Sequence, residues 1–174
     1  MSKNFLNPKE INYNSAMLFS NPGALLTVED KEKTNTMTIG WGEIGFAWGK
    51  NIITVMVRPE RFTYPLLENA ETFSVSFFDD GFKDKIIFCG RNSGKDVDKF
   101  TKCNFSVDYH ENTPYIKEGK LTAICKKLYT QEMSLEGFEE GYKDLGEKFY
   151  GKDGKANGGL HKFYVAEILS LFEE

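Results

Sequence analysis

The chain has 174 residues, and its 22 lysines and arginines against 26 acidic residues give a formal net charge of −4. A chain of this length is large enough for a substantial core, and we expect residues 1–174 to form a single domain. The acidic balance argues against a nucleic-acid partner bound through overall positive charge. No apolar run approaches the roughly 20 residues that cross a bilayer, and residues 1–5 lack a secretion signal, so we expect no membrane partner and a cytoplasmic location.

Strand patterns dominate the chain. Apolar residues that alternate or run at strand length predict strands over 23–29, 34–41, 51–57, 72–78, 105–109, 121–129 and 161–168. Short helices are expected over 64–69, 82–89, 96–102 and 143–150. The polar, glycine-rich segment 136–159 is expected to be a surface excursion. Many short strands with few helices favour a barrel over a doubly wound sheet.

The segment 34–41 has one apolar and one small polar face. In a strand, alternate side chains share a face, and the apolar face here consists of Met37, Ile39 and Trp41. On the other face, Gly40 has no Cβ and lets a flat ring approach backbone amides, while Thr38 offers a hydroxyl beside them. An ordinary half-buried strand with a glycine at a bulge is the alternative.

The strand over 51–57 ends at a turn that carries two arginines. Pro59 stops the strand because proline cannot donate to a sheet ladder. Thr63 is expected to cap the helix over 64–69, and the start of a helix attracts anions. Arg58 and Arg61 flank this start and offer forked donors to phosphate oxygens, although two solvated surface arginines would give the same pattern.

A glycine-rich loop lies within residues 89–100. It combines exposed amides with hydroxyl and cationic side chains, contributed by Gly90, Arg91, Ser93, Gly94, Lys95 and Lys99. Successive amides with nearby cations form anion-binding nests. The spacing does not match a P-loop, and a mobile surface loop of alternating charge is the alternative. Asp96 is expected to cap the helix that follows.

Other motifs give little support to catalysis by side chains. Gly40, Gly42 and Gly45 fit the dinucleotide pattern G-x-G-x-x-G, but residues 46–49 lead into a strand where that pattern requires a helix, so we do not expect a Rossmann domain. The two histidines and three cysteines lack metal-binding or C-x-x-C spacing, so we assign no metal site and no catalytic residue. We interpret His161 as a hydrogen-bonded strand histidine, and buried, structural thiols as the default for the cysteines.

Three motifs together resemble a known family. Thr-Met-Thr-Ile-Gly-Trp at 36–41, Val-Arg-Pro-Glu-Arg-Phe-Thr at 57–63 and Ser-Gly-Lys-Asp-Val-Asp-Lys-Phe at 93–100 resemble the flavoredoxin-like members of the flavin reductase family, which are FMN-binding split-barrel proteins. The resemblance extends from about residue 22 to residue 167. It implies a mainly β, Greek-key split β-barrel with a few short helices. It also implies a homodimer that binds FMN non-covalently near the subunit interface.

The resemblance also implies site residues by position. The residues expected along the isoalloxazine ring are Met37, Thr38, Ile39, Gly40 and Trp41. Those expected to serve the phosphate and ribityl chain are Arg58, Arg61 and Thr63, and those expected to close the phosphate side are Ser93, Gly94 and Lys99. Which cation holds the phosphate is open between Lys95 and Lys99, and between Arg58 and Arg61.

The function that follows from the resemblance is that of an FMN-dependent oxidoreductase. A flavin carries the redox chemistry itself, which agrees with the scarcity of catalytic side chains. NADH, NADPH, or another small-molecule or protein donor would reduce the flavin, and electrons would pass to an acceptor; an electron-transfer flavoprotein would use the same cofactor. The alternative is a non-redox split-barrel module that binds a phosphate-bearing ligand other than FMN, or haem.

Overall fold

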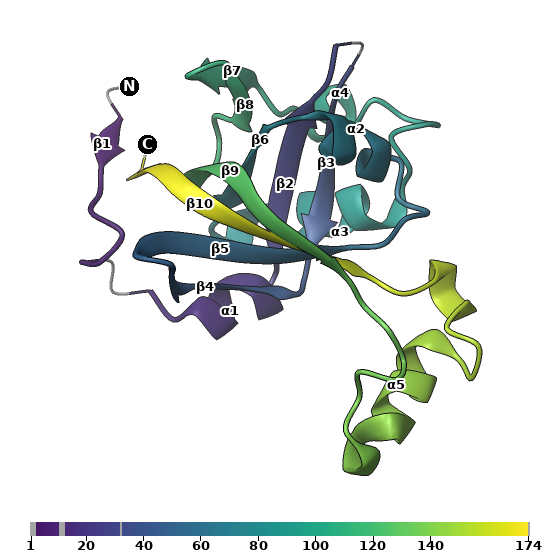
Figure 1. Cartoon of the computed structure of the whole chain (residues 1–174). Coiled ribbons are helices and arrows are strands. Elements are labelled where there is room, and N and C mark those ends of the chain that lie inside the picture. The colour runs from purple at the N-terminus through teal and green to yellow at the C-terminus, as the bar shows by residue number, and fades with distance from the viewer. Residues whose placement is uncertain (1–2, 11–12, 32, 174) are drawn as a thin grey trace.

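The structure is a computed structural model that describes residues 3–10, 13–31 and 33–173. Figure 1 shows a strongly curled sheet with short helices around it, and an arm carrying α5 (Lys143–Tyr150) that extends away from the barrel. No helix in the described part of the chain is long and apolar enough to cross a membrane.

The main sheet is antiparallel and runs in the order β3-β2-β6-β9-β10-β5-β4, with β1 beside β10. Its strands are β1 (Asn4–Phe5), β2 (Ala24–Glu29), β3 (Thr34–Ile39), β4 (Gly42–Ala47), β5 (Lys50–Val57), β6 (Thr72–Phe77), β9 (Leu121–Glu132) and β10 (Lys162–Glu173). A separate hairpin joins β7 (Val107–His110) to β8 (Thr113–Ile116). Because β3 is at the end of this order, one of its edges has no strand partner.

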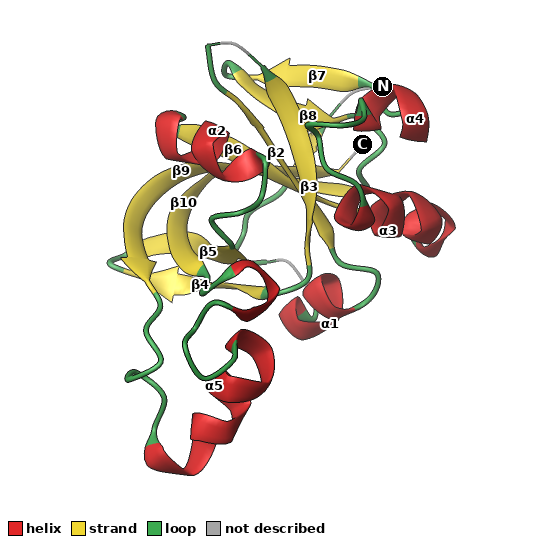
Figure 2. Ribbon diagram, turned by 90° about the vertical axis from the view of Figure 1, so that its right-hand side faces the viewer, coloured by secondary structure: helices red, strands yellow, loops and turns green. Residues whose placement is uncertain are grey.

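The described residues contain five α-helices, of which four lie against the sheet and α5 lies on the arm. They are α1 (Ser15–Ser20), α2 (Thr63–Asn69), α3 (Lys83–Arg91), α4 (Lys99–Cys103) and α5. Single 3₁₀ turns occupy Asp80–Phe82, Glu140–Tyr142 and Ala156–Gly158. Figure 2 shows α3 and α4 beside β3, with the loop that joins them at the same side of the sheet.

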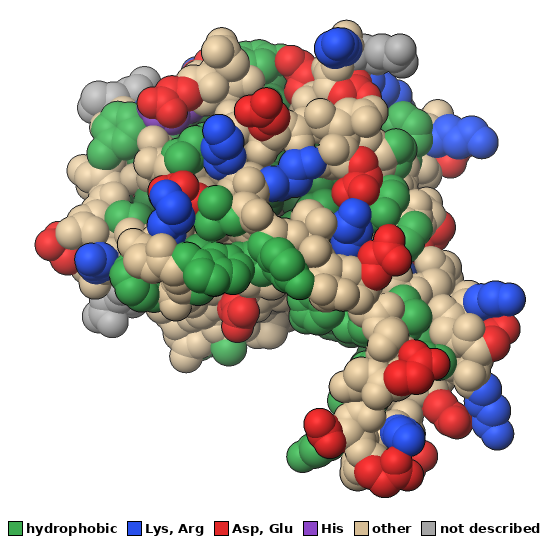
Figure 3. All heavy atoms as spheres, in the orientation of Figure 1, with side chains coloured by type: hydrophobic (Ala, Val, Ile, Leu, Met, Phe, Trp, Pro, Cys, Tyr) green, Lys and Arg blue, Asp and Glu red, His purple; other side chains and the backbone are tan. Residues whose placement is uncertain are grey.

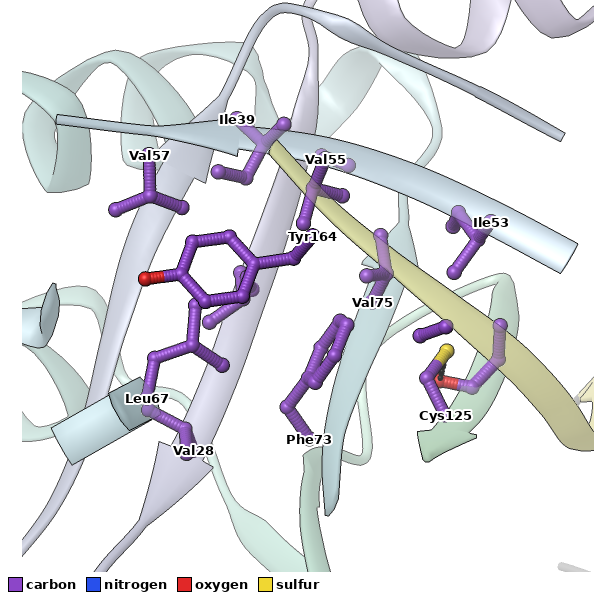
Figure 4. Packing of buried hydrophobic residues seen from close by; sticks show 14 of the residues in the cluster. Val28, Ile39, Ile53, Val55, Val57, Leu67, Phe73, Val75, Cys125 and Tyr164 are labelled. Carbon is purple, nitrogen blue, oxygen red and sulfur yellow. Dashed lines mark hydrogen bonds between the residues drawn. The ribbon is translucent and has the colours of Figure 1, made fainter. Parts of the chain in front are cut away.

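The core fills the inside of the curled sheet. Alternate residues of β5 are fully buried and face Phe73 and Val75 of β6 and Tyr164 of β10 (Figure 4). Burying a side chain the size of Phe73 contributes about 2–3 kcal/mol. The Tyr164 hydroxyl, at the edge of this core, donates to Glu68 Oε1 at 2.7 Å, which satisfies its polar end.

The mainly β, split-barrel class predicted from the sequence is confirmed, as are the strands and helices expected over most ranges. The elements that were not expected are β1, α1, β4 and β8. β4 gave no clear strand pattern because its sequence, Gly-Glu-Ile-Gly-Phe-Ala, contains two glycines and few β-branched residues. β4 begins at Gly42, which confirms that no helix follows the glycine pattern there.

Two predicted helix caps are wrong. The N-cap of α2 is Phe62 with no side-chain cap bond, and Thr63 is the first residue inside the helix. α4 begins at Lys99 and is capped by Asp98, not by Asp96. The Asp98 carboxylate accepts hydrogen bonds from the backbone amides of Phe100 at 3.0 Å and Thr101 at 3.3 Å. Both caps lie two or fewer residues from the predicted ones.

Candidate functional site

The unpaired edge of β3 forms one wall of a cavity. The carbonyl of Thr36 accepts a hydrogen bond from Lys99 Nζ. The backbone groups of Thr36 therefore point away from β2, towards the free edge. Backbone groups alternate in direction along an antiparallel strand, and those of Thr38 therefore point to the same free edge. Thr38 lines the cavity, while its hydroxyl donates to the carbonyl of Ile86 in α3 at 2.6 Å.

The cavity has a volume of about 310 Å³ and joins three segments that are distant in the sequence. β3 contributes Met37 and Thr38, the turn after β5 and the start of α2 contribute Arg61 and Thr63, and the loop after α3 contributes Ser93 and Gly94. Lys99 of α4 completes the lining. The turn with the arginines and the glycine-rich loop thus face one shared cavity.

Lys99 is the most buried cation of this cavity, with 4% of its surface exposed. Its Nζ donates to the carbonyls of Thr36 at 2.9 Å and Cys89 at 2.8 Å, which ties α4 to both β3 and α3. Burial lowers the pKa of Lys99, and the charge of Arg61 acts in the same direction. An ammonium group has three donors. Two are used here, which leaves one for an anion in the cavity.

Thr63 and Gly94 are held together through Asn35. Asn35 Nδ2 donates to Thr63 Oγ1 at 2.8 Å, which leaves the Thr63 proton as a donor. A Cβ on residue 94 would lie 2.3 Å from Asn35 Oδ1, closer than two such atoms can approach. The loop therefore needs glycine at 94 in order to pack against β3.

Arg61 is an exposed cation in the lining of the cavity. About half of its side chain is exposed, and its only ion pair in the described chain is with Glu60 at 3.7 Å. An exposed pair of this kind is worth little, and an anionic ligand can displace it. Arg91 also lines the cavity.

Arg58 lies outside the cavity. Of the two arginines between which the sequence left the phosphate contact open, only Arg61 lines the cavity. It is 8% exposed, and its Nη1 donates to the carbonyls of Ala156 at 3.3 Å, Gly159 at 3.2 Å and Asn157. Its guanidinium also lies 5.1 Å from the centre of the Tyr150 ring. Arg58 therefore holds the excursion between β9 and β10 and does not line the cavity. Of the two lysines left open, Lys99 lines the cavity and Lys95 does not.

Three of the five residues expected along the ring also do not line the cavity. Ile39 is 1% exposed and belongs to the barrel core. In front of Gly40 the space is open, since a Cβ there would meet nothing closer than 4.0 Å. The prediction that Trp41 shares the apolar face of Met37 and Ile39 is wrong, because β3 ends at Ile39 and leaves Trp41 39% exposed in the link to β4.

Trp41 instead belongs to an aromatic group that the sequence did not reveal. Its ring lies 4.8 Å from that of His161 and 5.2 Å from that of Phe149. His161 Nδ1 and the Tyr150 hydroxyl form a hydrogen bond of 2.7 Å, which agrees with the interpretation of His161 as a hydrogen-bonded histidine. Burial lowers the His161 pKa to about 4, and the charges of Arg58 and Arg61 act in the same direction. His161 is therefore neutral at pH 7. The influence of the Arg61 charge also places His161 near the Arg61 side of the cavity.

The described residues contain no group of three or more His, Cys, Asp or Glu side chains arranged to hold a metal ion. Cys89 lines the cavity and its Sγ lies 3.8 Å from that of Cys103, with both thiols buried and free. The pKa of Cys89 is raised to about 12. Burial is the largest cause, and the neighbouring thiol of Cys103 is the second. The thiol is therefore protonated at neutral pH.

A curled antiparallel sheet, with a cavity lined by Arg61, Arg91 and Lys99 at one free strand edge, defines a protein of the split-barrel class. The flavin reductase like domain model matches residues 16–171, so the chain belongs to this family. No curated protein matches the chain.

Solved structures agree with the family assignment. The flavoredoxin of Methanosarcina acetivorans is similar with a TM-score of 0.67 and 26% identity, over 100% of this chain and 76% of that chain. An FMN-binding protein from Thermus thermophilus with bound p-hydroxybenzaldehyde has a TM-score of 0.65 and 22% identity, over 87% and 70%. An NADH:FAD oxidoreductase from Streptomyces globisporus C-1027 has a TM-score of 0.61 and 16% identity, over 87% and 74%. The last two similarities establish the fold alone.

Proposed function

We propose that the cavity beside β3 binds FMN and that the chain is an FMN-dependent oxidoreductase. It would take electrons from NADH, NADPH or another donor and pass them to a small-molecule or protein acceptor. The observation that carries this proposal is the shared cavity, which is lined by β3 together with Arg61 and Lys99.

The lining fits a ligand with an anionic tail. Arg61, Lys99 and the hydroxyls of Thr63 and Ser93 converge on the same space, and charge-assisted hydrogen bonds from such groups favour a phosphate. A volume of about 310 Å³ lies at the lower end of the range for ligand sites. The space in front of Gly40, just after the end of β3, is also open.

The ring of the ligand would lie at the β3 edge. The Thr38 backbone groups point to that edge and supply main-chain contacts without a side-chain catalyst. When bound, FMN accepts a hydride or electrons, so the residues of this chain need only bind it, orient it and set its charge environment. The cations at the cavity favour a negatively charged reduced ligand over a neutral one.

The donor would approach from the aromatic side. Trp41 and His161 present ring surfaces close to Arg61, and a neutral His161 adds no charge there. A flat aromatic donor such as a nicotinamide gains from offset stacking on these rings. The names of the flavoredoxin and the NADH:FAD oxidoreductase support a flavin-centred redox role for a chain of this fold.

We also propose a homodimer. Hydrophobic side chains gather on the face of the molecule shown in Figure 3, over β5 and the strands beside it. Trp48 is 66% exposed and Tyr129 is 48% exposed, with their rings 6.2 Å apart. Exposed aromatic groups of this size mark interaction surfaces. Light scattering behind a sizing column tests this: a mass near twice 19.9 kDa supports the dimer, and a monomer at working concentration contradicts it.

An anaerobic titration tests the function. Protein saturated with FMN should show quenched flavin fluorescence, and addition of NADH or NADPH should bleach the flavin absorbance. Bleaching by neither nucleotide, but by a reduced protein donor or dithionite, would favour an electron carrier over a reductase. An absence of FMN binding, seen as unchanged fluorescence and an unchanged melting temperature, would contradict the site assignment.

A further inference from the structure

The excursion between β9 and β10 returns to the barrel close to the proposed flavin site. Figure 1 shows that it leaves the end of β9, carries α5 away from the barrel and comes back to the start of β10. His161 is its last residue, and the His161 ring lies 4.8 Å from that of Trp41. Trp41 is three residues after Thr38, which lines the cavity, and three residues span at most about 11 Å. The aromatic group is therefore within reach of a ligand beside Thr38.

One guanidinium holds the returning end of the excursion. Nη1 of Arg58 donates to the carbonyls of Ala156, Asn157 and Gly159. The three residues 157–159 all have positive φ angles, between 55° and 89°, which turn the chain around the guanidinium. Glycine adopts such angles without the strain that a Cβ causes. With 8% of its surface exposed, Arg58 is enclosed by this segment.

The same guanidinium reaches the aromatic group through Tyr150. It lies 5.1 Å from the centre of the Tyr150 ring, a distance at which a cation is attracted to a ring face. The hydroxyl of this buried tyrosine bonds His161 Nδ1 at 2.7 Å. Phe149, the neighbour of Tyr150 in α5, lies 5.2 Å from the Trp41 ring. A continuous series of contacts thus leads from Arg58 to the two rings at the end of β3.

The turn after β5 serves both the excursion and the cavity. A Cβ on residue 158 would overlap the carboxylate of Glu60, so Glu60 packs directly against Gly158. Glu60 also lines the cavity and pairs with Arg61 at 3.7 Å. Arg58 and Glu60 therefore hold the excursion, while Arg61 lines the cavity. Through this turn, the position of the aromatic group is fixed relative to the cavity.

We propose that Arg58 is a positioning residue for a nicotinamide donor. By holding the excursion and Tyr150, it fixes His161 and Trp41 as the ring surface on which the donor stacks. The inference rests on the proposed function, because it needs a flavin in the cavity. In the step concerned, a hydride leaves the dihydronicotinamide, which is oxidised, and reduces the oxidised flavin to its anionic reduced form. Displaced rings would slow this transfer without releasing the flavin, since Arg58 does not line the cavity.

Stopped-flow reduction of FMN-loaded protein, with NADH or NADPH varied up to saturation, tests the inference. Arg58→Met keeps the length of the side chain and removes its donors. We expect the maximal rate divided by the half-saturating nucleotide concentration to fall about tenfold or more. FMN affinity and the rate of reduction by dithionite, which needs no ring surface, should stay as in wild type. Arg58→Lys keeps a cation with three donors and should recover part of the lost rate.

Two further substitutions separate positioning from a general loss of structure. Gly159→Ala strains a positive φ angle within the held segment and leaves Arg58 in place, so it should slow reduction by the nucleotides and retain FMN. Gly49→Ala imposes the same kind of strain in the turn between β4 and β5, with nothing within 4 Å of the new Cβ, and should not slow it. Tyr150→Phe removes the bond to His161. Combined with Arg58→Met, it should add little, because both act through one series of contacts.

Three results would overturn the inference. In Arg58→Met these are unchanged kinetics with both nucleotides, or a loss of FMN affinity as large as the loss of rate. If that variant does not fold, Gly159→Ala decides by the same comparison. The third is a wild type that binds FMN and is bleached by neither nucleotide, which leaves the flavin site intact. Wild type that binds no FMN would instead show that the proposed function itself is wrong.

Discussion

Lys99 Nζ donates a hydrogen bond of 2.9 Å to the carbonyl of Thr36, and this contact joins α4 to the strand edge that forms the cavity. A second bond, to the Cys89 carbonyl, joins the same ammonium to the end of α3. One side chain therefore holds three elements around the proposed phosphate site.

Replacing Lys99 by methionine should destabilise the fold. The carbonyls of Thr36 and Cys89 would lose their donor in a buried setting, and each such loss costs about 1–3 kcal/mol. We expect the free energy of unfolding, measured with urea, to fall by about 1–3 kcal/mol for each of the two carbonyls, and FMN binding to weaken. Lys102→Met, at an exposed position of the same helix, should have little effect; an equal effect of the two would contradict the role of Lys99.

Arg61 and Arg58 should differ in what they control. Arg61→Ala removes a charge-assisted donor and should weaken FMN about 10-fold to 100-fold, with riboflavin, which lacks the phosphate, unchanged. Arg58→Ala frees three carbonyls of the excursion and should instead speed proteolysis between β9 and β10. Isothermal titration and limited trypsin digestion measure the two effects. Loss of riboflavin binding in Arg61→Ala would show that the arginine acts through the fold and not through the phosphate.

A methyl group at residue 94 should disrupt the site. Gly94→Ala places a Cβ 2.3 Å from Asn35 Oδ1, so the loop must move away from β3 or Asn35 must give up its bond to Thr63. Crowding of this kind costs typically about 1–3 kcal/mol. We expect a lower melting temperature and weaker FMN binding. Gly81→Ala is the matched control, because a Cβ there meets nothing within 4 Å, and loss of binding in that variant would remove the steric explanation.

His161 should make stability depend on pH. Its pKa is about 4 in the folded chain and 6.5 as the ordinary value, so between these values the unfolded chain binds a proton that the folded chain does not. Stability should therefore fall as pH falls from 6.5 towards 4. His161→Gln should lose this part of the pH dependence in urea unfolding at pH 7 and pH 4.5, whereas His110→Gln should retain it. An unchanged pH dependence in His161→Gln would contradict the low pKa.

The cysteines should resist thiol reagents in the native protein. Cys89, Cys103 and Cys125 are each 4% exposed or less, and burial raises the pKa of both Cys89 and Cys125. The thiolate is the reactive form, so labelling should be limited by unfolding. Ellman's reagent should detect the three thiols in denaturant and react slowly without it. Fast reaction of a thiol in native protein at neutral pH would show that Cys89 is open to the cavity.

Local patterns in the sequence predicted most of the barrel. The β-branched run of β5 and the alternation in β2 and β6 identify strands directly, because burial on one or both faces leaves a period in the residues. The sequence of β4 shows no such pattern, because it contains two glycines and its Phe46 is exposed, so apolar and polar residues do not alternate clearly. Its pairing with β5 is fixed by the tight turn that follows it, where Trp48 and Gly49 have positive φ angles.

The candidate site was predicted less completely. The sequence identified the turn at Arg61 and the loop at Gly94 as anion sites, and the structure brings both to one cavity. It gave no means to separate Arg58 from Arg61, because the choice depends on carbonyls of the excursion about 100 residues further along the chain. The contact of Trp41 with His161 was missed for the same reason, since only the folded chain brings these rings together.

The most direct test of the flavin site is a map of where FMN binds, from backbone amide NMR shifts during titration with FMN and with riboflavin. We predict that FMN moves the amide signals of Thr38, Thr63, Ser93, Gly94 and Lys99 together. Riboflavin should move Thr38 and leave those of Ser93 and Gly94 nearly unchanged. Shifts confined to another surface, or no shifts at saturating FMN, would contradict the flavin site beside β3.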